Sequence, residues 1–149
     1  MKVNGSHTLK APIDKVWEFL MDPESISKVL PGCKSLEETQ PDVFEGTLEI
    51  GIAAVKGSYS GSVQLLDKER PTSYRMIIDG TGKRGFVKGE ASIDLKAQDE
   101  DTILSYDADT QVGGLIANVG QRMLSGAAKM IINQSLKKLD KELTSDTAE

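Results

Sequence analysis

The sequence predicts an α+β domain in which a curved, seven-stranded antiparallel sheet wraps around one long C-terminal helix. Two observations favour this fold. Residues 33–112 alternate between apolar and polar with short polar breaks, whereas residues 115–143 contain no proline or turn cluster and are rich in helix formers. With 149 residues, the chain is long enough for one core but short for two. We therefore expect a single domain over residues 1–149.

The N-terminal part predicts one strand and two short helices. Residues 3–9 are extended in character and lead to Pro12, which is tolerated at the first position of a helix. Apolar residues then recur at three- and four-residue spacing, which predicts a helix with one buried face. These residues are Ile13, Val16, Trp17 and Leu20. The Asp-Pro-Glu run at 22–24 supplies an N-cap, an N1 proline and a first-turn acid for a second helix, which ends before Pro31.

The central part predicts six more strands joined by hairpin-sized connections, and so an antiparallel meander. The strands are expected at residues 33–39, 43–53, 57–66, 73–81, 86–97 and 102–112. Two glycines follow, and one uninterrupted helix is expected over about residues 114–143, with a polar tail at 144–149. At 1.5 Å per residue this helix is roughly 40 Å long.

Sorting the strands by alternation gives a sheet with one apolar face, which the long helix must cover. Mid-strand glycines fall on this apolar face, namely Gly46, Gly61, Gly80 and Gly89. Two explanations are open: strong sheet curvature or close approach of the helix backbone, on the one hand, and a hollow between sheet and helix, on the other. The three tyrosines of the chain also point to this face and offer hydroxyls there. They are Tyr59, Tyr74 and Tyr106.

If the hollow forms, we expect it to be lined by apolar, small and aromatic side chains from both layers. The expected lining residues are Phe44, Gly46, Leu48, Tyr59, Gly61, Val63, Tyr74, Met76, Ile78, Gly89, Ala91, Tyr106, Ala108, Ile116, Val119, Met123 and Met130. Methionine at helical spacing is more often core than cavity wall, so both interpretations of Met123 and Met130 are open. Gly120 and Gly126 lower the intrinsic stability of the helix and would permit close contact or a bend.

Composition excludes several classes of function. A formal net charge of −5 argues against a nucleic-acid surface, and no apolar run is long enough to span a bilayer. Cys33 and His7 are the only residues of their types, which excludes an internal disulfide and a Cys/His zinc site, so we expect no metal or cofactor. We expect His7 to be exposed or hydrogen-bonded, without a catalytic partner. The glycine-rich run at 80–85 lacks phosphate-loop spacing, but its Lys83-Arg84 pair could lie at a cavity mouth.

The order of elements resembles the helix-grip fold of the START-like (SRPBCC) superfamily over nearly the whole chain. Within it, five runs are similar to the CoxG family, the G subunit of carbon monoxide dehydrogenase. They are residues 11–20 (APIDKVWEFL), 22–24 (DPE), 30–33 (LPGC), 80–87 (GTGKRGFV) and 112–122 (VGGLIANVGQR).

The resemblance implies an accessory protein of a molybdenum-containing dehydrogenase or related hydroxylase, carrying a lipid or quinone-like molecule in the helix-grip cavity. It implies a role in maturation, membrane recruitment or electron-acceptor supply. Many members continue into a membrane-anchoring tail, whereas residues 144–149 here are polar. We therefore expect a cytoplasmic protein, with peripheral or partner-mediated contact at the inner face of the cell membrane. Homo-oligomerisation is left open.

Two other functions remain open at this point. One is a cyclase, isomerase or hydrolase acting on a hydrophobic substrate in the same cavity, which would need a titratable residue inside. The other is an adaptor that binds a partner protein through the apolar helix, which would need a filled interior and an exposed apolar patch.

Overall fold

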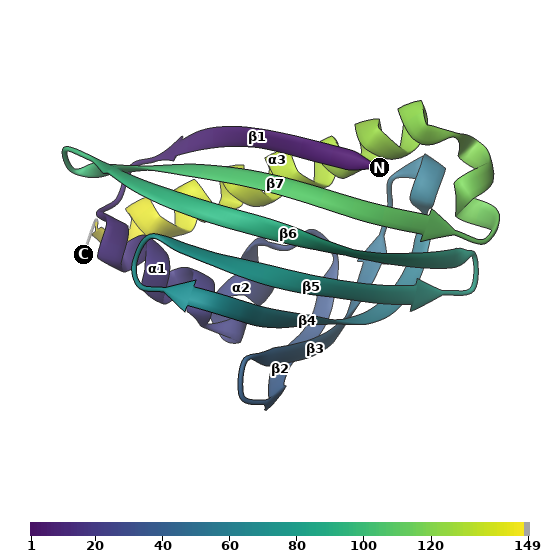
Figure 1. Ribbon diagram of the computed structural model, residues 1–149, viewed down its shortest axis with the longest axis horizontal. Helices are drawn as coiled ribbons and strands as arrows, with labels where there is room; N and C mark the ends of the chain where they lie inside the picture. The colour runs from purple at the N-terminus through teal and green to yellow at the C-terminus, as the bar shows by residue number, and fades with distance from the viewer. Residues whose placement is uncertain (148–149) are drawn as a thin grey trace.

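The computed structural model describes residues 1–147, which form one seven-stranded antiparallel sheet with helices on one side (Figure 1). The strands are β1 (Lys2–Leu9), β2 (Cys33–Gln40), β3 (Val43–Ile50), β4 (Gly57–Glu69), β5 (Ser73–Gly82), β6 (Gly85–Gln98) and β7 (Asp101–Gly113). The helices are α1 (Ile13–Met21), α2 (Pro23–Val29), the 3-10 turns η1 (Ala53–Val55) and η2 (Leu115–Val119), and α3 (Gln121–Thr147). The predicted α+β fold is confirmed. The last two residues of the expected polar tail lie outside the described residues.

The strands pair in the order β1-β7-β6-β5-β4-β3-β2, so the predicted meander is confirmed and β1 closes against β7. The hairpin turns use residues suited to them. Asp42 and Asp99 adopt positive φ angles of 63° and 55°, a conformation that aspartate tolerates better than most side chains. The predicted third strand is too long: β3 ends at Ile50, and residues 53–55 form η1 instead.

The main core lies at the end of the sheet where α1 and α2 pack (Figure 1). The apolar stripe predicted for α1 is buried, with Val16, Trp17 and Leu20 inside. Trp17 meets Tyr74 of β5 edge-to-face, with ring centroids 5.7 Å apart. Leu143, near the end of α3, is fully buried in the same cluster. These contacts fix the C-terminal part of α3 against one end of the sheet.

The expected single helix over residues 114–143 is wrong at its start. The chain forms η2, breaks at Gly120 with φ +93° and ψ 155°, and only then begins α3. This backbone conformation is open almost exclusively to glycine, so Gly120 interrupts the helix instead of bending it. α3 then packs against β1 and α2. Its buried residues are Leu124, Ala127, Leu136, Leu139 and Leu143.

Gly126 provides a test of helix stability in α3. It is exposed, and a β-carbon at this position would meet no atom within 4 Å. We expect Gly126→Ala to raise the free energy of unfolding by about 0.5–1 kcal/mol, because alanine loses less backbone entropy in a helix. Urea unfolding measures the change. Gly120→Ala is the control and should instead destabilise; a Gly126→Ala protein no more stable than wild type would contradict a regular helix here.

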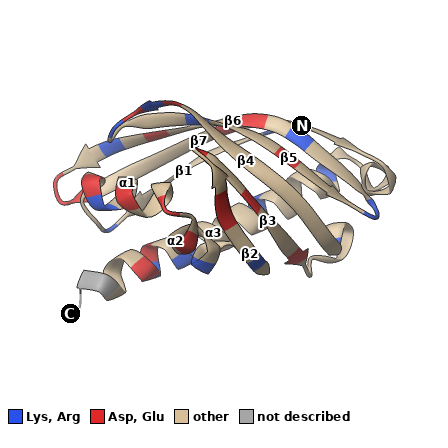
Figure 2. Cartoon of the chain, turned by 90° about the horizontal axis from the view of Figure 1, so that it is seen from below, with Lys and Arg blue, Asp and Glu red and all other residues tan. Residues whose placement is uncertain are grey.

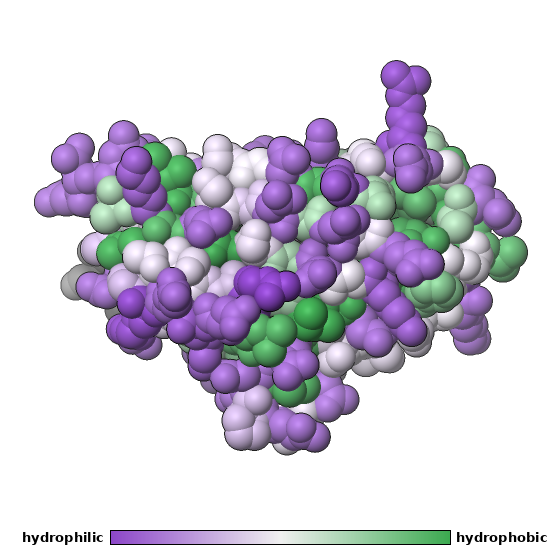
Figure 3. All heavy atoms as spheres, viewed as in Figure 1, coloured by the Kyte–Doolittle hydropathy of each residue, from purple (hydrophilic) through white to green (hydrophobic). Residues whose placement is uncertain are grey.

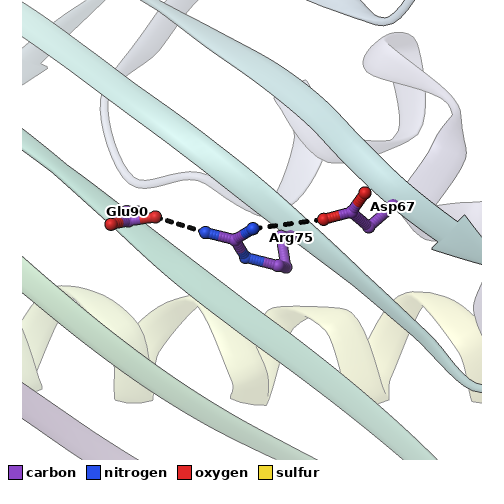
Figure 4. Close-up of polar contacts among 3 residues, drawn as sticks. All are labelled: Asp67, Arg75 and Glu90. Carbon is purple, nitrogen blue, oxygen red and sulfur yellow. Dashed lines mark hydrogen bonds and ion pairs between the residues drawn. The ribbon is translucent and has the colours of Figure 1, made fainter.

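The outer face of the sheet is polar. Arg75 of β5 donates to Asp67 at 3.1 Å and to Glu90 of β6, which places a cation between two carboxylates (Figure 4). Acidic residues gather mainly at the end of the molecule that carries α1 and α2 (Figure 2). Because these groups are exposed, their ion pairs contribute little to stability.

None of the helices in residues 1–147 is long and apolar enough to cross a membrane.

Candidate functional site: a hollow on the glycine floor of the sheet

Three inner-face glycines lie side by side across the middle of the sheet. Gly46 of β3 pairs with Gly61 of β4, which pairs with Gly80 of β5. Neighbouring strands are about 4.8 Å apart, so this glycine row leaves roughly 10 Å of bare backbone facing the helices. Sequence alternation correctly placed the three residues on one face, but their cross-strand alignment emerges only from the register.

Both explanations of the mid-strand glycines apply, at different positions. A β-carbon at Gly46 would lie 2.1 Å from the Ser35 carbonyl oxygen, and one at Gly61 would lie 2.4 Å from that of Asp79. These two glycines therefore permit the close strand approach of a strongly curved sheet. At Gly80 the nearest atom would be 4.0 Å away. Gly80 therefore faces open space and makes room in the hollow.

A hollow of about 140 Å³ lies over the glycine row. Its apolar wall comes from the inner faces of β2–β5 and from the residue that ends α2. The bordering residues are Leu30, Ser35, Leu36, Phe44, Gly46, Thr47, Leu48, Tyr59, Ser60, Gly61, Ser62, Val63, Ile78, Asp79 and Gly80. A dry, apolar cavity of about 150 Å³ is large enough to bind benzene. The hollow can therefore accept one ring-sized apolar group.

A second hollow of about 300 Å³ lies farther along β3, between the sheet and α3. Its borders are Pro31, Gly32, Glu49, Ile50, Gly51, Ile52, Ile131 and Gln134. Gly32 shapes this region because its φ is +72° and a β-carbon there would lie 1.9 Å from the Glu49 carbonyl oxygen. Its own carbonyl accepts a hydrogen bond from the Glu49 N–H at 2.8 Å. The Leu-Pro-Gly-Cys run is thus a tight turn that ties the end of α2 to β3.

The three tyrosines do not converge on one point. The Tyr59 hydroxyl donates to the Val55 carbonyl at 2.6 Å, and Tyr59 is the one tyrosine among the residues that border the two hollows described. Burial raises the pKa of its phenol, while the nearby Arg84 charge acts in the opposite direction. Tyr74 is buried against Trp17, and Tyr106 lies over Gly5 of β1. A shared role for the three hydroxyls is therefore not supported.

The remaining residues of the expected lining are distributed over the core and the surface. Tyr74, Ala91 and Ile116 are buried, and Met76 and Tyr106 pack against the main core. Gly89, Ala108 and Val119 are partly buried. Met123 and Met130 are 55% and 50% exposed, which does not fit the expectation that they are cavity walls. The break at Gly120 sets the rotation of α3, and Leu124 and Ala127 face inward instead.

The expectation that His7 is exposed or hydrogen-bonded is wrong. His7 lies on the same face of β1 as the buried Val3 and Leu9, and its Nε2 atom is buried without a hydrogen-bond partner among the described residues. The residues around His7 in the sequence are polar, but they point to the other side of the strand. Strand alternation beginning at Val3 could have placed it correctly.

The wall of the 140 Å³ hollow is mostly apolar, whereas Glu49 and Gln134 also border the 300 Å³ hollow. Asp79 borders the 140 Å³ hollow but is exposed. Burial raises the pKa of the Cys33 thiol, which does not favour a reactive thiolate. Within residues 1–147 there is no group of three or more His, Cys, Asp or Glu side chains that could hold a metal ion. The 140 Å³ hollow is suited to burying an apolar group.

The fold and these motifs can now be compared with known proteins. The family described as the G subunit of carbon monoxide dehydrogenase (CoxG) matches residues 5–144. The chain belongs to the CoxG family. The match covers every element from β1 to α3, apart from the first residues of β1 and the last turn of α3. No protein with a curated description matches the chain.

Solved structures agree with the predicted helix-grip fold. A Geobacillus kaustophilus protein is 44% identical, with a TM-score of 0.94 over 97% of this chain and 96% of that chain. A START superfamily protein from Mycobacterium smegmatis is 14% identical, with a TM-score of 0.77 over 97% of both chains. The Zhui aromatase/cyclase from Streptomyces sp. R1128 is 19% identical, with a TM-score of 0.67 over 97% and 93%. For the last two proteins, at 14% and 19% identity, the likeness shows the fold alone.

Proposed function

We propose that this CoxG protein is a non-catalytic accessory protein that holds an apolar small molecule, a lipid or a quinone-like compound, on the helix side of its sheet, where the 140 Å³ hollow lies over the glycine row and the 300 Å³ hollow lies against α3. The glycine row is the observation that carries the proposal. Gly46, Gly61 and Gly80 leave a floor without side chains under the 140 Å³ hollow. Leaving such a hollow empty costs stability, because its walls lose packing contacts. An apolar ligand would restore those contacts.

The family assignment supports a molybdenum-containing dehydrogenase as the partner that this protein serves. In that setting the bound molecule would assist maturation, membrane recruitment or the supply of an electron acceptor. No side chain that borders the 140 Å³ hollow, as described, supplies a buried carboxylate or imidazole for catalysis. The likeness to an aromatase/cyclase therefore adds no separate support for an enzyme.

Peripheral membrane contact is supported by one end of the molecule. Leu115 and Met123 are 63% and 55% exposed, and hydrophobic surface gathers at the end with η2 and the start of α3 (Figure 3). Lys83, Arg84 and Arg122 are exposed on the neighbouring β5–β6 turn and the first turn of α3. Apolar side chains among cations suit an anionic lipid surface. This end would therefore face the membrane in our proposal.

Replacing Gly80 with leucine tests the ligand site. The new side chain would enter the open space over the glycine row, so we expect at least a tenfold loss of affinity for N-phenylnaphthylamine, an uncharged apolar fluorophore. Apolar molecules that co-purify with the protein should fall in parallel when solvent extracts are measured by mass spectrometry. Thr81→Leu adds the same side chain at the next residue, which is exposed, and is the matched control.

The Thr81→Leu protein should bind as the wild type does. Circular dichroism checks that the Gly80→Leu protein is folded. If the folded variant binds the fluorophore with wild-type affinity, the proposed ligand site is wrong. The site is also wrong if the wild-type protein binds no fluorophore and yields no apolar molecule.

A further inference from the structure

A polar groove, the outer groove, lies on the face of the sheet that points away from the helices. It has a volume of about 500 Å³ and runs across β2, β3, β4 and β5. Its walls are hydroxyls and carboxylates, and none of the described residues that border it is a lysine, arginine or histidine. The bordering residues are Ser35, Glu37, Thr39, Glu45, Gly46, Thr47, Ser60, Gly61, Ser62 and Asp79.

The carboxylates of the outer groove belong to one row across the strands. Glu37 of β2 lies directly opposite Glu45 of β3, and Figure 2 shows acidic residues on both strands. The row continues through Ser62 of β4 to Asp79 of β5. Like charges directly opposite each other on neighbouring strands destabilise a sheet. This arrangement therefore costs stability, and a bound cation would remove that cost.

No basic side chain within residues 1–147 forms an ion pair with the three carboxylates of the row. The outer-face ion pairs of Lys34 and Arg75 use other acids. Lys88 is the cross-strand neighbour of Asp79, but its ammonium lies over the Phe86 ring, 5.6 Å from the ring centroid. The negative charge of the outer groove is thus left for an external cation.

The spacing of the carboxylates matches a chain of cations better than a single ion. Neighbouring strands are about 4.8 Å apart, so the backbones of Glu45 and Asp79, two strands apart, are separated by about 10 Å. One metal ion needs its oxygen ligands within about 2.6 Å. No group of three or more His, Cys, Asp or Glu side chains in the described part of the chain could hold one. In an extended peptide, side chains on one face recur every 7 Å or so, and long basic side chains can reach both acids.

The hydroxyls of the outer groove favour a peptide as the cationic occupant. The side chains of Ser60 and Ser62 make no hydrogen bond within residues 1–147. A peptide offers carbonyl groups that can accept hydrogen bonds from these hydroxyls, whereas a protonated polyamine offers only N–H donors. A second copy of this chain is disfavoured, because both copies would carry a net charge of −5. The cationic segment is therefore expected on a different protein.

We propose that the outer groove docks an extended segment of a partner protein that carries lysine or arginine at alternate positions. The cations of the segment pair with Glu37, Glu45 and Asp79, and its carbonyl groups accept hydrogen bonds from the serine hydroxyls. The inference goes beyond the proposed function, because the outer groove and the 140 Å³ hollow lie on opposite faces of the sheet. Docking weakens as salt is added, because exposed charges are screened over about 8 Å at physiological ionic strength.

The peptide Lys-Thr-Lys-Thr-Lys-Thr-Lys is the probe, and the same peptide with glutamate in place of lysine is the negative control. In an NMR titration of isotope-labelled protein, the basic peptide should produce saturable amide shifts in β2–β5, and the acidic peptide should produce none. The Glu37→Gln/Glu45→Gln double variant should bind the basic peptide about tenfold more weakly. Asp94→Asn/Asp107→Asn removes the same charge from exposed outer-face positions of β6 and β7 and is the matched control. The control variant should bind within about twofold of wild type.

Loss of binding can be separated from loss of folding. Glu37→Gln removes one of two opposed carboxylates, so its Tm should equal or exceed that of wild type while its affinity for the basic peptide falls. Equal weakening in the two double variants would reduce the effect to net charge and overturn the proposal, as would amide shifts confined to other strands.

Two other occupants give distinct results. Displacement of the basic peptide by calcium or spermidine at matched ionic strength would identify a small-cation site and overturn peptide docking. Self-association in sedimentation experiments that Glu37→Gln/Glu45→Gln abolishes would assign the outer groove to a second copy of the chain, and would also overturn the proposal.

Discussion

Gly61→Ala is expected to lower the free energy of unfolding by about 3 kcal/mol, although it adds only one methyl group. The added carbon would lie 2.4 Å from the Asp79 carbonyl oxygen and 2.9 Å from the Gly80 α-carbon. Both neighbours are backbone atoms of β5, so they can move only if the β4–β5 pairing moves. In a chain of this length a loss of about 3 kcal/mol corresponds to a fall in Tm of roughly 6–12 °C.

Gly80→Ala is the matched control, because it adds the same methyl group on the next strand at the paired position. The nearest atom would be 4.0 Å away, so no strand has to shift. We expect a change within about 0.5 kcal/mol, or a small gain as the unfolded chain loses freedom. Thermal unfolding of both variants measures the difference. Equal losses of unfolding free energy in the two variants would contradict the distinction between Gly61, which permits close strand approach, and Gly80, which faces open space.

This pair marks how far the sequence alone could go. Twofold alternation placed Gly61 and Gly80 on the inner face, and the hairpin turns implied the meander that makes them neighbours. Alternation could not separate the roles of these two glycines, because the roles depend on the local angle between strands. The same limit applies to α3: Gly120 was recognised as a weak point of the helix, but only its backbone angles show that the helix begins after it.

The candidate site was predictable where alternation decides orientation, as for Phe44, Leu48 and Val63. It was not predictable on α3, because the break at Gly120 changes which side of the helix meets the sheet and leaves Met123 exposed. Leu30, in the turn between α2 and β2, was missed as a lining residue because turns have no periodic pattern. The Leu-Pro-Gly-Cys motif around it was the available signal.

Tyr74 is expected to make the fold sensitive to alkaline pH. Its side chain is buried against Trp17, and its hydroxyl has no hydrogen-bond partner among the described residues. Burial raises the pKa of the phenol far above its ordinary value of 10.0, because the phenolate would be charged in an apolar core. The folded protein therefore keeps the proton at pH values where the unfolded chain has released it. By linkage, this contribution to stability is intact below pH 10 and is lost as the pH rises above it.

Tyr74→Phe isolates that contribution. Above pH 10 the wild type should lose up to about 1.4 kcal/mol of unfolding free energy per pH unit more than the variant, or roughly 2 kcal/mol between about pH 10 and pH 12. The other titrating groups are shared by both proteins, so their effects cancel in the difference. Urea unfolding at several pH values measures the difference, and parallel stability curves for the two proteins would contradict burial of the Tyr74 side chain. At pH 7 the variant should be as stable as the wild type, because phenylalanine fills the same place beside Trp17 and leaves no polar atom unpaired.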